Sequence, residues 1–317
     1  MIAVTGAGSP LGAKIVKRLS DRGEEVREID NIEDMNLQGC QSVYHCLEHF
    51  DLTNTSQDFY ETNVVATEKV LRNAAAAGVK KTLIVSSIAA AGPDQNIQIR
   101  TEDDTPAPLP APYQETKRMA EESALRIAAE ENLDVVIVRP TCLVGKGMRF
   151  PALWFAAYAN SSGRTIPCGR DYLYNFIGVD DAAAGCMLAM EKGKAGEIYN
   201  LASSKHLTLH DTLTLFSELS GLPPVRNVVV PLPLILLSIH LRASLPGGNN
   251  EALTGEFIEN YLTWNWIASN EKARNDLGFD PEPIDRYWRE TICWAAEQGF
   301  LRKSAAARVK DFVVTCR

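Results

Sequence analysis

Short hydrophobic runs alternate with amphipathic segments through the first half of the chain. The runs are typical of buried strands, and the segments between them have the periodicity of helices. The expected strands are Ile2–Thr5, Glu25–Asp30, Ser42–Cys46, Lys81–Ser87 and Asp134–Arg139, and the expected helices are 10–22, 57–77 and 116–131. Because these strands are apolar on both faces and alternate with helices, the pattern predicts an α/β fold built on a doubly wound parallel sheet.

The pattern changes after Pro140. Proline and glycine become more frequent, strands shorten, and helical segments such as 209–219 and 283–297 follow without regular alternation. This change predicts a smaller, mixed C-terminal lobe that closes over the carboxyl edge of the sheet. The expected division is a sheet domain over 1–165 with 177–203 partly packing back on it, a smaller lobe over 166–303 and a basic tail over 304–317.

One edge of the sheet is expected to be trimmed. Only ten residues, Asn31–Cys40, separate the second expected strand from the third. A crossover between parallel strands needs a dozen residues or more and usually contains a helix. A full helix–strand–helix excursion therefore does not fit after the second strand.

A glycine-rich turn connects the first strand to the first helix. In Thr5-Gly6-Ala7-Gly8-Ser9-Pro10-Leu11-Gly12 the first glycine permits a tight turn and the last lets the helix pack closely on the sheet. Free N–H groups at the helix N-terminus can hold a pyrophosphate. The context predicts a Rossmann-type dinucleotide site, against the alternative of a purely structural turn. The binding residues expected here are Gly6, Gly8, Ser9, Pro10, Leu11 and Gly12.

Asp30 ends the second strand, 18 residues after Gly12. A carboxylate at this place accepts hydrogen bonds from ribose hydroxyls and repels a 2′-phosphate, which favours NAD over NADP. Arg22 and Arg27 keep NADP open, and an aspartate that only caps a turn is the alternative. Asn31 is expected in the same site.

Tyr113 and Lys117 are the residues with the most distinctive chemistry. Their spacing puts both side chains on one face of a helix. A neighbouring ammonium favours the phenolate and lowers the pKa of a tyrosine, which makes it usable as a base near neutral pH. The alternative is a solvated helix face, because this spacing is common by chance.

Composition limits the classes of partner. The chain has 317 residues and a net charge of −8, which disfavours nucleic acid as a partner. Seven scattered cysteines without metal-ligand spacing are typical of reduced thiols and predict no metal site. The chain begins without a signal-like segment, and its longest apolar run, Val228–Leu241, is too short to span a bilayer. We expect a cytoplasmic protein for which 228–241 could contact a membrane surface.

Together these motifs make the chain similar to the extended short-chain dehydrogenase/reductase family, and within it to the 3β-hydroxysteroid dehydrogenase-like branch. The similarity covers Met1 to about Leu301. The segments that carry it are Val85-Ser86-Ser87-Ile88, Ala91-Gly92-Pro93, Pro110-Ala111-Pro112-Tyr113 with Lys117, Arg139-Pro140-Thr141-Cys142-Leu143-Val144-Gly145, Thr62-Asn63-Val64, Val179-Asp180-Asp181-Ala182, Tyr199-Asn200-Leu201 and Lys272–Gly278.

The resemblance implies roles for several of these residues. Tyr113 would be the general acid/base, Lys117 would lower its pKa and hold the nicotinamide ribose, and Ser87 would bind the substrate oxygen. Asn63 matches a family asparagine behind the active site, and Ser86 is the alternative for the serine role. Further cofactor contacts are implied for Leu47, Ser86, Pro140, Cys142 and Leu143. The family also makes a homodimer through two long helices an expectation.

Two features depart from the family pattern. Ser9 replaces the usual central glycine of the phosphate turn, and the strand that carries the adenine-contacting acid falls in the trimmed region. The run His45-Cys46-Leu47-Glu48-His49 replaces a usual step of small residues. Glu48 or His49 could face the cofactor, with solvated loop residues as the alternative.

Site residues favour one chemistry of the family over the others. Ile88-Ala89 follow Ser87 where dehydratases carry an Asp-Glu pair, and Tyr174 stands where epimerases of nucleotide sugars carry an arginine, although Arg170 could substitute. We therefore expect an NAD(P)-dependent oxidoreductase that interconverts a secondary alcohol and a ketone or aldehyde. The alternatives are a nucleotide-sugar epimerase and a non-catalytic NAD(P)-sensing protein.

Apolar segments of the second half predict a hydrophobic, steroid-like substrate. Pro151–Tyr158 and Val228–Leu241 supply aromatic and aliphatic surface of the kind that lines pockets for apolar ligands. Ordinary core or interface packing is the alternative for both segments.

Overall fold

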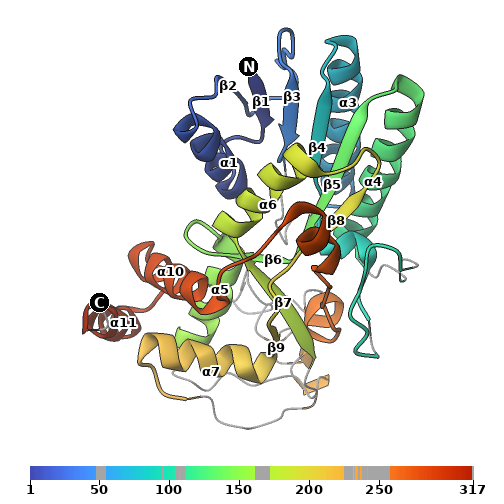
Figure 1. Ribbon diagram of the computed structural model, residues 1–317. Coiled ribbons are helices and arrows are strands. Elements are labelled where there is room, and N and C mark those ends of the chain that lie inside the picture. Colours follow the sequence, from blue (N-terminus) through green and yellow to red (C-terminus); the bar gives the residue numbers. More distant parts are fainter. Residues whose placement is uncertain are drawn as a thin grey trace.

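The computed structural model describes residues 1–47, 55–94, 96–104, 107, 111–160, 172–224, 231, 233–234, 236–237, 241 and 258–315. A six-stranded parallel sheet has the order β2-β1-β3-β4-β5-β8 (Figure 1). Its strands are β1 (Ile2–Thr5), β2 (Val26–Ile29), β3 (Ser42–His45), β4 (Lys81–Val85), β5 (Asp134–Pro140) and β8 (Ile198–Leu201). The predicted doubly wound α/β fold is confirmed.

Helices cover both faces of this sheet (Figure 1). On one face α1 (Pro10–Asp21) packs against α6 (Val179–Lys192), and on the other α3 (Ala66–Ala76) packs against α4 (Pro112–Glu131). Neighbouring strand residues point to opposite faces, so Val4 joins the core beneath α1 and α6, whereas Ala3 joins the core beneath α3 and α4. Burial on both faces explains why inner strands such as β1 and β5 are mainly apolar.

The sheet ends at β2, as the short connection after it predicts. Residues 30–41, all described, contain neither a helix nor a strand, and they lead directly from β2 across β1 to β3. Arg27 Nη1 donates to the carbonyl oxygens of Asn36 at 2.8 Å and Gln38 at 3.0 Å. These bonds hold the connection beside the edge strand.

A second layer lies below the carboxyl edge of the sheet (Figure 1). It contains a three-stranded sheet of order β6-β7-β9 and several helices. Its strands are β6 (Cys142–Val144), β7 (Leu173–Gly178) and β9 (His206–Thr208), and its helices are α5 (Arg149–Asn160), α7 (Leu209–Ser220), α10 (Ile284–Glu297) and α11 (Lys303–Thr315). Most of the expected tail thus forms α11, which buries Ala305 and Val309. The domain boundaries stay a prediction.

Aromatic side chains fill the core of this second layer. The ring of Trp154 lies 5.8 Å from that of Phe176 and 6.3 Å from that of Trp288, between centroids, and Phe216 lies 4.8 Å from Trp288. Contacts of this kind stabilise a core beyond the area they bury. Trp154 belongs to the apolar segment expected near a substrate, and its place in this core supports the alternative of ordinary packing.

The segment expected as one helix over 57–77 is interrupted. The structure has a short helix α2 (Ser56–Phe59), a π-helical turn η1 (Tyr60–Val65) and then α3. This turn was not predicted from the sequence. The remaining short elements are the 3₁₀ helix η2 (Ile88–Ala91) and the π turns η3 (Ile258–Leu262) and η4 (Ala273–Leu277).

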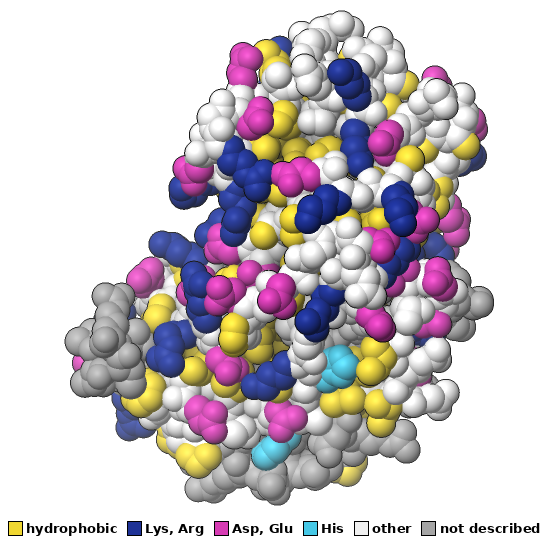
Figure 2. Space-filling view, in the orientation of Figure 1, with side chains coloured by type: hydrophobic (Ala, Val, Ile, Leu, Met, Phe, Trp, Pro, Cys, Tyr) yellow, Lys and Arg dark blue, Asp and Glu magenta, His cyan; other side chains and the backbone are white. Residues whose placement is uncertain are grey.

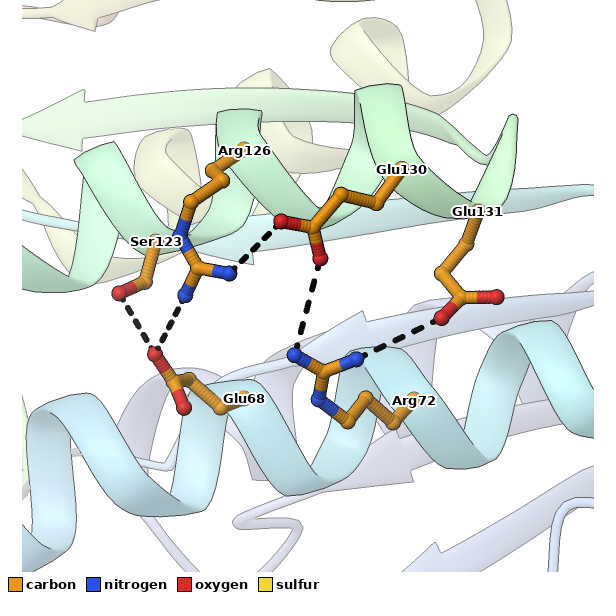
Figure 3. Close-up of polar contacts among 6 residues, drawn as sticks. All are labelled: Glu68, Arg72, Ser123, Arg126, Glu130 and Glu131. Carbon is orange, nitrogen blue, oxygen red and sulfur yellow. Dashed lines mark hydrogen bonds and ion pairs between the residues drawn. The ribbon is translucent and has the colours of Figure 1, made fainter.

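Ion pairs join α3 to α4 along their outer side (Figure 3). Glu68 Oε1 accepts from Arg126 Nη2 at 2.9 Å and from Ser123 Oγ at 2.7 Å. Arg72 lies 3.4 Å from Glu131 and 3.7 Å from Glu130. Each exposed pair contributes at most about 1 kcal/mol to the free energy of unfolding.

The apolar run 228–241 lies mostly outside the described residues. Of its members, Leu234, Leu237 and Leu241 are exposed, with relative exposures of 56%, 54% and 62%. Within the part of the chain that the structure describes, no helix is both long and apolar enough to cross a membrane.

Candidate active site

The glycine-rich turn has the geometry of a phosphate cradle. Gly6 has φ +69°, and a Cβ there would lie 2.7 Å from the backbone of Leu47. A Cβ on Gly12 would lie 2.1 Å from the carbonyl oxygen of Gly6. Ser9 caps α1: its hydroxyl accepts from the amide of Gly12 at 3.0 Å and donates to the oxygen of Gly6 at 2.7 Å. Pro10 opens the helix, and the turn leaves no room for side chains at either glycine.

Asp30 lies at the mouth of this turn. Its Oδ1 accepts from the amide of Gly8 at 2.8 Å. Asp30, Asn31 and Gly8 are exposed, and Leu11 is buried in the core beneath the turn. A carboxylate therefore stands beside the free end of the phosphate turn, as the spacing from Gly12 predicts.

Ser86 and Ser87 follow β4 directly at the carboxyl edge of the sheet. Ser87 is half-buried and caps η2, where its Oγ accepts from the amide of Ala89 at 3.2 Å. Ser86 is buried, and among the described residues its Oγ has no hydrogen-bond partner. The two serines therefore differ in solvent accessibility: Ser87 is half-buried, whereas Ser86 is buried.

Tyr113 lies in the first turn of α4, and Lys117 follows one turn later. Both are buried, with exposures of 6% and 3%, so the alternative of a solvated helix face does not hold. The Nζ of Lys117 lies 5.8 Å from the centroid of the Tyr113 ring, and the edge of that ring packs against Phe59 at 5.6 Å between centroids. Helix η2, which Ser87 caps, packs against α4. The structure therefore brings the three catalytic candidates to one corner.

Asn63 reaches the same corner from the π turn. Its Nδ2 donates to Thr116 Oγ1 at 3.0 Å, and Thr116 lies between Tyr113 and Lys117 on α4. The Oδ1 of Asn63 is buried and has no partner among the described residues. π turns occur often at functional sites because they redirect a side chain out of the helical register. Here the turn directs the carboxamide of Asn63 toward α4.

Sequence reasoning missed a buried histidine at this site. His45 ends β3, and its Nδ1 lies 2.6 Å from Thr5 Oγ1 while its Nε2 lies 3.0 Å from Thr67 Oγ1. Burial, together with the positive charge of Lys117, lowers the pKa of His45 to about 3. The imidazole is therefore neutral at physiological pH. Its place at the end of a strand, next to the phosphate turn, was the available signal.

A small cavity lies between these groups. It has a volume of about 10 Å³, which is room for one water molecule. Its walls are formed by the end of β3, the π turn, the end of β4 and the inner side of α4. The polar residues that line it are His45, Asn63, Thr67, Ser86, Lys117 and Glu121.

The other expected cofactor residues lie around the sheet edge. Pro140 ends β5 and is buried, whereas Cys142 and Leu143 in β6 and Leu47 after β3 are half-buried. Burial raises the pKa of the Cys142 thiol to about 12, so this thiol is not a nucleophile near neutral pH. Glu48 and His49, which could face the cofactor, lie outside the described residues.

An ion pair that sequence reasoning also missed ties the catalytic helix to β5. Arg139 donates two hydrogen bonds to the carboxylate of Glu121, at 2.8 and 2.6 Å, and both side chains are less than a tenth exposed. Removing one partner of such a pair leaves a buried, uncompensated charge. The pair therefore fixes the position of α4 relative to the sheet.

Sequence comparison agrees with this geometry. A sequence model described as the NAD dependent epimerase/dehydratase family matches residues 2–202, which is more than half of the chain. The chain belongs to this family. It is an enzyme of the extended short-chain dehydrogenase/reductase type, and NAD is its cofactor.

Individual relatives cover nearly the whole chain. Sterol demethylase protein B of Methylococcus capsulatus is 26% identical, over 94% of this chain and 99% of that protein. The 4-hydroxy-2-methyl-3-oxo-4-farnesyl-3,4-dihydroquinoline-1-oxide ketoreductase of Stigmatella aurantiaca is 27% identical, over 87% of this chain and 90% of that protein. The crystal structure of DesIV, a dTDP-glucose 4,6-dehydratase from Streptomyces venezuelae with NAD bound, superimposes with a TM-score of 0.73 at 20% identity, over 96% and 99% of the two chains.

The phosphate turn of this epimerase/dehydratase family member fits NAD. The space that a Cβ at Gly6 or Gly12 would occupy is already filled by backbone, so the turn is as tight as a pyrophosphate cradle requires. The N-terminus of α1 provides the positive end of the helix dipole for phosphate, and the carboxylate of Asp30 provides an acceptor for ribose hydroxyls.

A larger groove lies elsewhere on this enzyme, between α1, α6 and α10. Its volume is about 650 Å³, and Figure 2 shows Lys and Arg side chains gathered with Asp and Glu on this side of the molecule. The charged residues that line it are Lys14, Arg18, Lys146, Asp180, Asp181, Glu282, Arg286, Arg289, Glu290 and Glu297. This lining is unsuited to an apolar substrate. No group of His, Cys, Asp or Glu among the described residues has the arrangement of a metal site.

Proposed function

We propose that this enzyme interconverts a secondary alcohol and a ketone on a hydrophobic substrate, with Tyr113 as the general acid/base. The observation that carries the proposal is the burial of Tyr113 beside Lys117, on a helix that packs against the turn capped by Ser87. One corner at the carboxyl edge of the sheet then contains a base (Tyr113), a cation that favours the ionised form of this base (Lys117) and a hydroxyl donor (Ser87). Ligands of open α/β sheets bind at this edge.

Each side chain has a defined task in this proposal. In the oxidative direction the Tyr113 phenolate removes the proton of the substrate hydroxyl, and in reduction the Tyr113 phenol returns it. Ser87 donates a hydrogen bond to the substrate oxygen, and the ammonium of Lys117 stabilises the phenolate. When bound, NAD supplies the acceptor for the hydride that leaves the carbinol carbon. Asn63 holds α4 through Thr116.

Two features favour this reaction over the others of the family. Ile88 and Ala89 follow Ser87, are buried and carry no acid for the elimination of water. Tyr174, in the place of an epimerase arginine, uses its hydroxyl to donate to the carbonyl oxygen of Leu262 at 2.9 Å and packs against Trp154. A buried tyrosine at this place offers no guanidinium group to a sugar diphosphate.

The names of the relatives point in the same direction. Two of these relatives align with nearly the whole chain: the sterol demethylase protein, and the ketoreductase whose name includes a farnesyl-substituted quinoline oxide. Their names describe large apolar molecules with a ring oxygen function. We therefore place the substrate of this chain among polycyclic or prenylated alcohols and ketones. The homodimer and the domain boundaries stay predictions.

A turnover assay tests the proposal. The purified protein is incubated with NAD and a panel of sterols and prenylated secondary alcohols, or with NADH and the matching ketones, while nicotinamide absorbance is followed. We expect oxidation or reduction of at least one apolar compound and none of UDP-glucose. Interconversion of UDP-sugars without a net change in NADH would identify an epimerase instead. Stabilisation by NAD without turnover of any compound would favour the non-catalytic alternative.

A further inference from the structure

A chain of short hydrogen bonds runs through His45 from one strand to the catalytic corner. Thr5 Oγ1 and His45 Nδ1 lie 2.6 Å apart, and His45 Nε2 and Thr67 Oγ1 lie 3.0 Å apart. Thr67 Oγ1 in turn donates to the carbonyl oxygen of Asn63 at 2.6 Å. The chain therefore joins three parts of the molecule that are distant in sequence: β1, β3 and the continuous segment formed by the π turn and α3.

The direction of these bonds fixes the state of the imidazole. The single proton of the Thr67 hydroxyl goes to the carbonyl of Asn63, so Thr67 can only accept from His45. The proton of His45 consequently lies on Nε2. Nδ1 is then an acceptor, and Thr5 donates to it. In a doubly protonated ring the bond to Thr5 would have to reverse, because Thr5 Oγ1 would then accept from Nδ1–H instead of donating to it.

Each end of the chain reaches a part of the site. Thr5 immediately precedes Gly6, whose amide donates to Ile29 O and whose turn lies against the backbone of Cys46 and Leu47. At the other end, Asn63 binds Thr116 on the catalytic helix. His45 thus stands between the phosphate turn and α4, and its side chain is 2% exposed.

The charged groups near His45 keep the ring neutral. In the small cavity that His45 lines, the charged side chains are Lys117 and Glu121, and Glu121 is bound to Arg139. The strands and the helix that carry Thr5 and Thr67 contribute hydroxyls to His45, and β4 contributes Ile84 and Val85 to the cavity. The positive charge of Lys117 opposes a second positive charge on the ring.

We propose that His45 is a positioning residue that couples the phosphate turn to the π turn of Asn63, as a neutral imidazole with its proton on Nε2. It holds the two halves of the site through separate arms: Nδ1 acts on the cofactor turn through Thr5, and Nε2 acts on the catalytic helix through Thr67 and Asn63. This inference rests on the proposed function for its kinetic consequences, whereas the ring state and the cofactor affinity do not depend on it.

Two substitutions separate the arms. In His45→Gln the carboxamide N–H₂ can replace Nε2–H and keep the bond to Thr67, whereas in His45→Asn the carboxamide oxygen can replace Nδ1 and keep the bond to Thr5. We expect His45→Gln to raise the Kd for NADH by about 10-fold with kcat nearly kept, since one neutral hydrogen bond contributes about 1 kcal/mol. We expect His45→Asn to lower kcat by about 10-fold with the Kd for NADH nearly kept. Equal losses in both quantities for both variants would contradict the proposal.

The threonines provide matched controls for the two arms. Thr5→Val should reproduce the effect of His45→Gln, and Thr67→Val should reproduce that of His45→Asn. The double variant of His45→Asn with Thr67→Val should lose no more than either single one, because both remove the same bond. Additive losses would show that the two side chains act independently and would overturn the coupling.

A nuclear magnetic resonance experiment on the wild-type protein needs neither a substrate nor a stable variant. Correlation of ring protons with ring nitrogens should show one protonated and one unprotonated nitrogen in His45, unchanged from pH 5 to pH 8. Titration of the ring within this range, or a proton on Nδ1, would refute the proposal even if turnover is found. Absence of turnover with an unchanged ring state would instead count against the proposed function alone.

Discussion

The two ends of the dinucleotide site differ in how far they are already formed. At the nucleotide end Gly8, Asp30 and Asn31 are exposed, and Asp30 uses its carboxylate to bind a loop amide. At the catalytic end Tyr113 and Lys117 are buried, within a corner fixed by hydrogen bonds and a bidentate ion pair. The proposed catalytic groups are thus held in place by the protein itself, whereas the nucleotide end keeps its proposed binding groups accessible to a ligand.

This difference has a physical reason. A proton-transferring group must be positioned before the reaction, because reorganisation during the reaction costs rate. A site for a large, charged cofactor must stay accessible instead, since its donors and acceptors have to exchange water for the ligand. Substitutions at the catalytic end should therefore affect turnover and leave binding intact, and those at the nucleotide end should do the reverse.

The largest effect is expected for Tyr113→Phe. The substitution removes the proton-transferring oxygen and keeps the ring that packs against Phe59. We expect kcat to fall by about 10³-fold, since general acid–base catalysis contributes about 10² to 10⁴. The Kd for NADH should change by less than about threefold. Steady-state kinetics and titration of NADH fluorescence measure the two quantities, and a variant with the full rate would remove Tyr113 from the role of base.

Gly12→Ala should have the next largest effect, at the opposite end. The new Cβ would lie 2.1 Å from the oxygen of Gly6 and 3.0 Å from Ser9 Oγ, so the turn must shift. We expect the free energy of unfolding to fall by about 3 kcal/mol, as for strongly overpacked sites, and the affinity for NADH to fall with it. Urea denaturation and NADH titration measure these changes.

Gly8→Ala is the matched control for that substitution. Its Cβ would lie 3.2 Å from a carboxylate oxygen of Asp30, and this flexible side chain can rotate away. The loss of stability should therefore be much smaller than for Gly12→Ala. Equal losses would mean that the backbone at Gly12 is not the reason for the tightness of the turn.

Acid should destabilise the protein through His45. Its pKa is lowered to about 3 in the folded state, below the ordinary value near 6.5 that applies in the unfolded chain. Between pH 6.5 and pH 3 the unfolded chain binds a proton that the folded protein does not, so stability is full above pH 6.5 and falls as the pH decreases. At pH 5 the loss is about 2 kcal/mol.

Urea denaturation at pH 7.5 and pH 5 measures this loss. In His45→Asn the difference between the two pH values should shrink by about 2 kcal/mol, because this side chain does not titrate. His206→Asn is a control in the second layer: burial also lowers the pKa of His206, but this residue is only half-buried and should account for a smaller part. An unchanged difference in His45→Asn would show that the ring is charged in the folded protein at pH 5.

The smallest effect concerns cofactor preference. Asp30→Asn keeps an oxygen that can accept from the amide of Gly8 and removes the charge. We expect the ratio of NADP to NAD affinity to rise by about 10-fold, which corresponds to about 1.4 kcal/mol. Glu28→Gln removes a carboxylate from the same strand β2, one residue before its end, and should leave the ratio unchanged. If the ratio of NADP to NAD affinity is unchanged in Asp30→Asn, the ribose of the cofactor does not bind beside Asp30.

The sequence alone was sufficient for five of the six strands of the sheet, for its trimmed edge and for the glycine-rich turn; β8 was not predicted as a strand. These features depend on local properties: the apolar runs, the length of the connection between Asp30 and Gln41, and the need for glycine where a Cβ would meet backbone. Spacing also placed Tyr113 and Lys117 on one face of a helix, because residues four apart share a face, and the resemblance to the family implied their catalytic role. Burial of the pair was not available from that spacing.

Only the tertiary structure decided how the catalytic corner is held. The π turn that directs Asn63 was not predicted from the sequence, and neither was the pairing of Arg139 in β5 with Glu121 in the preceding helix α4. His45 is an ordinary histidine in the sequence; its neutral state follows from the hydroxyls of Thr5 and Thr67 and the charge of Lys117. Local pattern determines which elements form, whereas the charge and orientation of a buried polar group depend on neighbours that only folding brings together.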